Sequence, residues 1–113
     1  MPAQADANAL SAFEQQHRQK AVQAAAQGRW ADAQAAWDVV LVLRPQDAEA
    51  SMRRREAVAA AADGVAERLP RARLAQRKGD LEGASRLYLE VLALDPWHAD
   101  AAAALRAIES ERL

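Results

Sequence analysis

The sequence repeats itself at a distance of 51 residues, and this duplication limits the chain to folds that are built from two similar units. When residues 28–50 are laid over residues 79–101, 8 of the 23 pairs are identical. The identical pairs include Gly28 with Gly79 and Pro45 with Pro96. We therefore expect both copies to contain the same succession of helices and turns.

Each copy has the pattern of a helix, a tight turn, a second helix and a stop. Gly28 and Gly79 follow apolar-periodic runs, where glycine can take the left-handed conformation that ends a helix. Pro45 and Pro96 end the second helices, because the residue before a proline avoids helical geometry. Apolar residues in the second helices share a spacing of three, four and three, which predicts one helical face: Trp30, Ala33, Trp37 and Val40, then Leu81, Ala84, Tyr88 and Val91.

The composition predicts an all-α fold, because 31 of the 113 residues are alanine and glycine and proline are rare. The expected helices cover residues 7–27, 30–43, 48–78, 81–94 and 98–112, within one domain over residues 1–113. The apolar stripe of the third helix passes through Gly64 and Pro70 without changing phase. It predicts one long helix, kinked near Pro70, with a break near Asp63 and Gly64 as the alternative. Asp47 is the expected N-cap of this helix.

The turns and second helices resemble the tetratricopeptide repeat (TPR), over about residues 14–47 and 65–98. Residues 28–33 and 79–84 carry the turn glycine, a large residue two positions later and a small alanine. An aromatic residue and a closing proline follow in both copies. The resemblance implies right-handed helical hairpins, here two degenerate repeats with a long connecting helix and a C-terminal capping helix near 98–112. An unrelated helical bundle is the alternative.

The sequence also departs from the TPR pattern. His17 and Arg68 stand where the family usually has a large apolar residue, and Lys20 and Arg71 stand where it prefers leucine. The period of 51 residues exceeds the family period of about 34, so about 17 extra residues lie between the two units. The resemblance is therefore strong in the turns and second helices and weak in the first helices.

Several classes of function are excluded or disfavoured by composition. The chain has no cysteine, which removes disulfides, thiolate metal sites and cysteine nucleophiles. A net charge of −1 is too mild for a general nucleic-acid binder. No apolar run approaches the roughly 20 residues that a membrane span needs.

Since residues 1–20 lack an apolar signal core, the chain as written is predicted to be cytoplasmic. An exported or membrane-tethered protein is the alternative if a signal was removed.

No catalytic, metal or cofactor site is expected. The two histidines, His17 and His98, have no partner at a metal-ligand spacing and are expected to pack or to cap helices. The carboxylates of the second helices are predicted to be solvated, which does not suit general acid–base catalysis: Asp32, Asp38, Glu82 and Glu90. No glycine-rich phosphate loop is present. We therefore predict no cofactor, no metal and no enzymatic activity.

The resemblance implies a concave surface that is lined by the first helices of the repeats. The predicted function is a protein–protein interaction or scaffold module that holds a partner segment in this short groove. Arg73 and Arg77 lie on one helix face, and together with Arg18 they are expected to favour an acidic or phosphorylated segment. A solvated helix face is the alternative for the basic run. Trp97 is expected either to cap the core or to contact a partner. The partner-binding candidates are Gln15, Arg18, Val22, Leu69, Arg73, Gln76, Arg77 and Trp97.

Two alternative functions remain open at the level of the sequence. Solenoids with fewer than about three repeats are short of neighbour contacts, so the chain is also a candidate for a self-associating structural module. Its last helix offers Ala102, Ala103 and Ala104 as a face that could pack on a second copy. The chain is, as a further alternative, a fragment of a longer TPR-containing protein.

Overall fold

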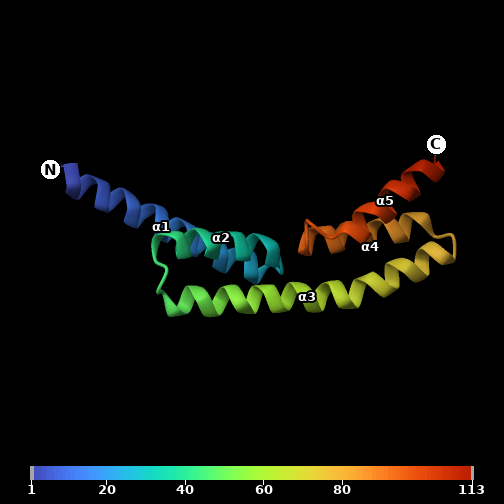
Figure 1. The fold of residues 1–113 in the computed structure, drawn as a ribbon, viewed down its shortest axis with the longest axis horizontal. Helices are drawn as coiled ribbons and strands as arrows, with labels where there is room; N and C mark the ends of the chain where they lie inside the picture. Colours follow the sequence, from blue (N-terminus) through green and yellow to red (C-terminus); the bar gives the residue numbers. More distant parts are fainter. Residues whose placement is uncertain (1, 113) are drawn as a thin grey trace. The chain divides into compact units, whose positions relative to one another are not determined.

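The computed structural model describes the backbone of residues 2–112 and the side chains of residues 7–112. This part of the chain is all-α, contains no strand and has five helices (Figure 1). They are α1 (Pro2–Ala26), α2 (Trp30–Leu43), α3 (Ala48–Arg77), α4 (Leu81–Leu94) and α5 (Ala99–Arg112). The all-α prediction is confirmed, and the helix bounds agree to within one residue except at the start of α1.

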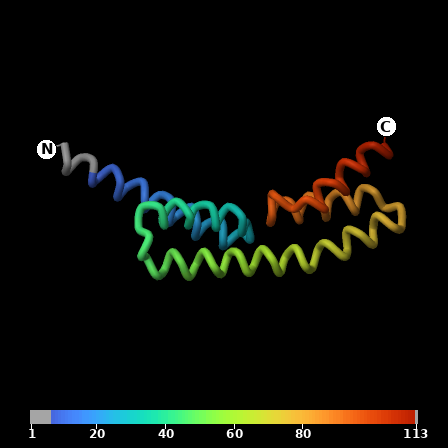
Figure 2. Tube along the Cα trace, in the orientation of Figure 1, coloured from blue at the N-terminus to red at the C-terminus, as the bar shows by residue number. Residues whose placement is uncertain are grey.

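The chain divides into two compact units that meet within α3. Unit 1 extends to Val58 and holds α1, α2 and the first part of α3. Unit 2 begins at Ala59 and holds the rest of α3, α4 and α5. Each unit is thus a hairpin of two helices with a third helix beside it, and the colours of Figure 2 follow this order along the chain.

Both hairpins turn at a glycine in the left-handed conformation. Gly28 has φ of 72° and Gly79 has φ of 82°. In the first turn the N–H of Arg29 donates to the Ala24 carbonyl at 2.8 Å, and the N–H of Gly28 donates to the Ala25 carbonyl at 3.0 Å. The second turn has the same two bonds at the equivalent positions of the second copy. Both α1 and α3 therefore end in a Schellman motif, which satisfies carbonyls that the helix leaves unpaired.

The third helix of each unit begins at a side-chain cap. The N–H of Ala50 donates to the Asp47 carboxylate at 2.8 Å at the start of α3. The N–H of Ala101 donates to Nδ1 of His98 at 3.1 Å at the start of α5. Asp47 and His98 occupy equivalent positions in the two copies, so the duplication extends to the cap. The N-cap prediction for Asp47 is confirmed, and His98 caps α5, which is one of the two roles expected for the histidines.

The cores of the two units correspond residue by residue. The buried cluster of unit 2 has seven members, and each has a buried counterpart at the equivalent position of unit 1. The pairs are Ala21 and Ala72, Ala33 and Ala84, Ala36 and Leu87, Trp37 and Tyr88, Val40 and Val91, Ala50 and Ala101, and Ala57 and Ile108. Unit 1 therefore has the same packing plan as unit 2, with a smaller side chain at Ala36 and Ala57 and a larger one at Trp37.

The long helix α3 is continuous through both residues at which a break was considered. Gly64 lies close to the end of α4, since a Cβ added there would meet Leu94 Cδ1 at 2.6 Å. Pro70 is exposed, and the ribbon of α3 curves in the part of the helix that contains it (Figure 1). Proline removes one backbone hydrogen bond and bends a helix without having to end it. The prediction of one long helix is confirmed.

The apolar side chains along α1 are buried only in the second half of the helix. Leu10 is 56% exposed and Phe13 is 45% exposed, whereas Ala21 and Ala24 are buried. The helix α1 has 25 residues and α2 has 14. Because every residue of an α-helix adds the same rise along its axis, α2 covers only the second half of α1. Leu10 and Phe13 therefore remain exposed on the first half of α1.

Enlarging the small residue at the centre of either hairpin is expected to destabilise its unit. Ala33 and Ala84 are fully buried between helices, so a leucine at either position must displace neighbouring side chains. Ala33→Leu and Ala84→Leu should each cost about 1–3 kcal/mol in urea unfolding. Ala35→Leu, on the exposed side of α2, is the matched control. Equal stability of Ala33→Leu and Ala35→Leu would contradict this packing.

Candidate functional site

Arg18, one of the expected groove residues, lies in a cluster of ion pairs inside unit 1. Its guanidinium pairs with Glu14 at 3.3 Å and with Glu49 at 3.6 Å. It also donates a hydrogen bond to Asp47, the cap of α3. Arg44, at the end of α2, donates a second bond to Glu14. With only 19% of its side chain exposed, Arg18 links α1 to α3 within the fold.

The hydrogen bonds of this cluster stabilise the ionised forms of its members. The bond from Arg44 lowers the pKa of Glu14. The N–H of Ala50, followed by Arg18, lowers the pKa of Asp47. The bond to Asp47 in turn raises the pKa of Arg18. Glu14, Arg18 and Asp47 are therefore ionised at neutral pH, and their ion pairs contribute to the stability of unit 1.

Unit 2 has apolar contacts where unit 1 has this cluster. Val65 stands at the position of Glu14 and Leu69 at the position of Arg18, and both pack against the unit 2 core. Leu69, which was expected to line a binding groove, thus contributes to the core. Gln76, also expected in the groove, accepts a hydrogen bond from the Tyr88 hydroxyl at 2.7 Å. These side chains are largely engaged within the fold.

The remaining candidates are exposed. Val22 is 60% exposed on α1, and Gln15 is exposed on the same helix. Arg73 and Arg77 are exposed on α3, where Arg73 approaches Asp100 at 3.7 Å. Of the eight candidates, those of α1 belong to unit 1, and those from Leu69 onward belong to unit 2.

Trp97 is the most exposed large apolar side chain among the described residues. It lies in the turn between α4 and α5 with 92% of its surface accessible. Its backbone N–H donates to the Asp95 carboxylate at 3.2 Å, which fixes the turn. The indole therefore does not cap the core, and a contact with a partner stays a prediction.

A groove that the sequence analysis did not identify lies between α1 and α2 in unit 1. We call it the α1–α2 groove; its volume is about 450 Å³. Its floor is apolar, and its rim carries two cations and one carboxylate, Lys20, Arg29 and Asp32. Its full lining is His17, Lys20, Gln23, Ala24, Arg29, Asp32, Ala35, Ala36 and Val39. It lies entirely within unit 1.

His17 at this groove is held by its own helix. Its Nδ1 lies 2.9 Å from the Phe13 carbonyl oxygen, and its ring lies 4.3 Å from the Phe13 ring, centroid to centroid. The histidine therefore shields part of the exposed Phe13 and forms one wall of the groove. The signal for this site in the sequence was the presence of His17 and Lys20 at positions where the TPR pattern, which the chain only resembles, has apolar residues.

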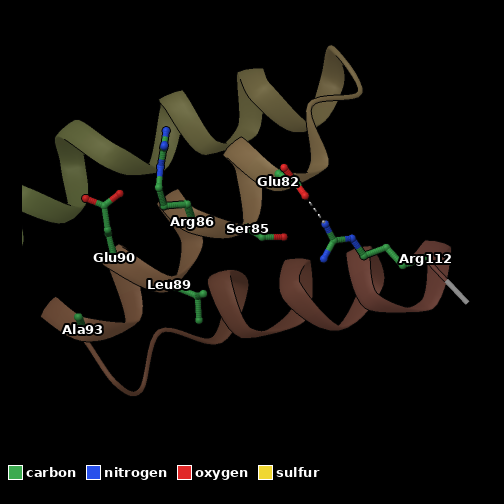
Figure 3. A pocket seen from close by; sticks show the side chains of 7 residues that line it. All are labelled: Glu82, Ser85, Arg86, Leu89, Glu90, Ala93 and Arg112. Carbon is green, nitrogen blue, oxygen red and sulfur yellow. Dashed lines mark ion pairs between the residues drawn. The ribbon is translucent and has the colours of Figure 1, made fainter.

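A second hollow, of about 520 Å³, lies between α4 and α5 in unit 2 (Figure 3). Arg112 of α5 points across it toward Glu82 of α4, at 3.8 Å. Its lining contains two carboxylates and two guanidinium groups, with Leu89 between the helices. The hollow therefore has no net charge and gives no electrostatic preference for a ligand of either sign.

The described residues offer no grouping suited to bind a metal ion. Of the carboxylates expected on outer faces, Asp38 forms an ion pair with Arg54, and Glu90 lies 3.5 Å from Arg68. These contacts lie on the surfaces of the two units and serve the fold. Within residues 2–112, no helix is both long and apolar enough to cross a membrane.

The chain was compared with models of protein families, with curated proteins and with solved structures, and none of them matches it. Its function must therefore be inferred from its own surfaces. Those surfaces are the α1–α2 groove, the neutral hollow of unit 2 and the exposed indole of Trp97.

Proposed function

We propose that the protein is a non-catalytic interaction or scaffold module that binds a segment of another protein. The observation that carries this proposal is the exposure of Trp97. Tryptophan is largely buried on average in folded proteins, and it is among the residue types most enriched at the energetic centres of protein interfaces. The fold of unit 2 buries Tyr88 and Ile108 without using this indole, so Trp97 is free to contact a partner.

We further propose that the two units are degenerate tetratricopeptide-like hairpins. The correspondence of their buried residues, position by position, supports a common hairpin plan. Ala33 and Ala84, the small residues of the repeat pattern, have no exposed surface. In such modules recognition comes from the faces of paired helices, which agrees with a groove between α1 and α2. Exposed Val22, Arg73 and Arg77 are further contacts available to a partner.

Removing the Trp97 side chain should reduce partner binding without reducing stability. Since the indole is 92% exposed, Trp97→Ala should change the free energy of unfolding by less than about 0.5 kcal/mol. Loss of a central interface tryptophan typically costs about 2 kcal/mol or more in binding. The measurement is affinity capture from cells of the source, with quantitative mass spectrometry, for the native chain and the variant.

The matched control is Val42→Ala, which truncates another exposed apolar side chain, in unit 1. Proteins that are captured by the native chain and Val42→Ala but lost by Trp97→Ala are the expected partners. An identical set of captured proteins for all three chains would contradict a role for Trp97.

Self-association is the rival function, and the described surface of α5 offers it little support. Ala104 packs against the core of unit 2, and Ala102 is partly buried, which leaves only Ala103 of this face exposed. Light scattering over a range of concentrations distinguishes the two functions. A dimer that persists on dilution would favour the structural module over partner binding.

A further inference from the structure

We propose that the α1–α2 groove of unit 1 is the binding site for an acidic amphipathic helix of a partner protein. The proposal rests on the proposed binding function and names the chemistry of the partner. It places the site on a face that the expected partner-binding residues do not include. Three properties of the groove support it: its charge, its difference from unit 2, and its floor.

The rim of the groove is cationic. Lys20 forms no ion pair with any carboxylate whose side chain the structure describes, and Arg29 approaches Asp32 only at 4.0 Å, with both side chains more than half exposed. Two cations against one weakly held carboxylate leave a positive rim. A partner that supplies carboxylates at this rim gains charge-assisted hydrogen bonds.

In unit 2, the positions equivalent to His17 and Lys20 form ion pairs with carboxylates. Arg68 and Arg71 are the counterparts of His17 and Lys20, so both hairpins carry at least one cation at these two positions. Glu67 pairs with Arg71 at 2.7 Å and with Arg68 at 3.3 Å. Glu90 adds a contact to Arg68 from α4. Arg68 and Arg71 are thus met by carboxylates of the chain itself.

Unit 1 lacks both of these carboxylates. Gln16 stands at the position of Glu67, and Val39 stands at the position of Glu90. The same basic positions are therefore left open at the α1–α2 groove, beside an apolar side chain. A partner helix with glutamate or aspartate on its flanks would supply the carboxylates that Glu67 and Glu90 supply in unit 2.

The floor of the groove suits a helix. It is formed by Ala24, Ala35, Ala36 and Val39, and small residues allow the backbones of two helices to approach closely. A helix of the fold already packs against this hairpin, since Ala50 of α3 belongs to the same buried cluster as Ala36, Trp37 and Val40. An amphipathic partner helix would bury its apolar stripe on the alanines and present its carboxylates to the rim.

The test is a titration of the full chain against a fluorescein-labelled peptide, followed by anisotropy. The peptide has about 15 residues, the length at which an isolated helix becomes marginally stable, with glutamates on both sides of a leucine and alanine stripe. One control peptide replaces every glutamate with glutamine, and another has the same composition in an order that removes the stripe. We expect binding of the first peptide, weaker binding of both controls, and a loss of affinity as salt rises.

The matched variants use the duplication. Lys20→Glu combined with Arg29→Glu reverses the charge of the rim and should weaken binding on the order of tenfold, because two attractions become repulsions. Arg71→Glu makes the same kind of change in unit 2 and should leave the affinity unchanged. Circular dichroism verifies that both variants fold, and the glutamine peptide tests the charge without any change to the protein.

Three results would overturn the proposal. They are equal affinity for the glutamate and glutamine peptides, unchanged affinity in the rim variant, and an equal loss in Arg71→Glu. A second copy of the chain is the other candidate occupant of the groove, and sedimentation of the free chain tests it. If the free chain is a dimer and the Lys20→Glu, Arg29→Glu variant is not, a second copy and not a partner helix occupies the groove. If the peptide does not bind the groove, the capture experiment with Trp97→Ala still tests whether the chain binds a partner. Failure of the groove proposal is therefore distinguishable from failure of the binding function itself.

Discussion

Replacing Trp37 with alanine is expected to destabilise unit 1 by about 3–5 kcal/mol, the usual cost of deleting a buried tryptophan side chain. Trp37 is 3% exposed, and most of the buried residues around it are alanines, such as Ala21, Ala36 and Ala50. Alanine has no rotamer with which to fill the space that the indole would leave. A unit of about 55 residues has only a few kcal/mol of stability, so the variant should be largely unfolded in unit 1.

Tryptophan fluorescence and circular dichroism together measure this loss. Trp30 remains in unit 1 as a partly buried probe, whereas Trp97 of unit 2 is already exposed and its emission should change little on unfolding. Val42→Ala, an exposed truncation on the same helix, is the control and should cost less than about 0.5 kcal/mol. If urea unfolds Trp37→Ala and Val42→Ala at the same midpoint, the indole does not hold unit 1 together.

Unit 1 is expected to unfold in acid before unit 2. The pKa of Glu14 and of Asp47 is lowered in the folded state, whereas the pKa of carboxyl groups in an unfolded chain is about 4. A lowered folded pKa means that the unfolded state binds protons first as the pH falls. The stabilisation is therefore complete above the unfolded pKa values and is lost progressively as the pH falls through the folded ones.

The measurement is an acid titration that compares tryptophan emission, which reports unit 1, with helical circular dichroism, which reports both units. The duplication supplies a variant that should resist acid: Glu14→Val combined with Arg18→Leu copies Val65 and Leu69 of unit 2. Replacing a partly buried ion pair by packed apolar side chains is often neutral or stabilising at neutral pH. The acid midpoint of tryptophan emission should therefore move to lower pH in the double variant.

Removing only Arg18 should have the opposite effect, because Glu14 and Asp47 would then lie close together without the guanidinium between them. Arg53→Ala, which breaks an exposed pair with Glu56, is the control and should not move the midpoint. An acid midpoint shared by the native chain and the Glu14→Val, Arg18→Leu variant would mean that other carboxylates govern the transition.

Local patterns in the sequence determined the helices, the turns and most of the core. The left-handed glycines, the prolines after the second helices and the three-four-three spacing each act over a few residues. They could therefore be read without knowledge of which helices meet. The duplication then predicted equivalent positions, and the structure extends them to the caps Asp47 and His98.

Only the tertiary structure decided how the surface side chains are used. The pairing of Arg18 with Asp47 spans 29 residues, and it depends on the start of α3 lying beside α1, which no local pattern specifies. Leu10 and Phe13 continue the α1 stripe but are exposed, because α2 is shorter than α1. The periodicity of a helix gives its apolar face, whereas the lengths and contacts of its neighbours decide which parts of the helix are covered.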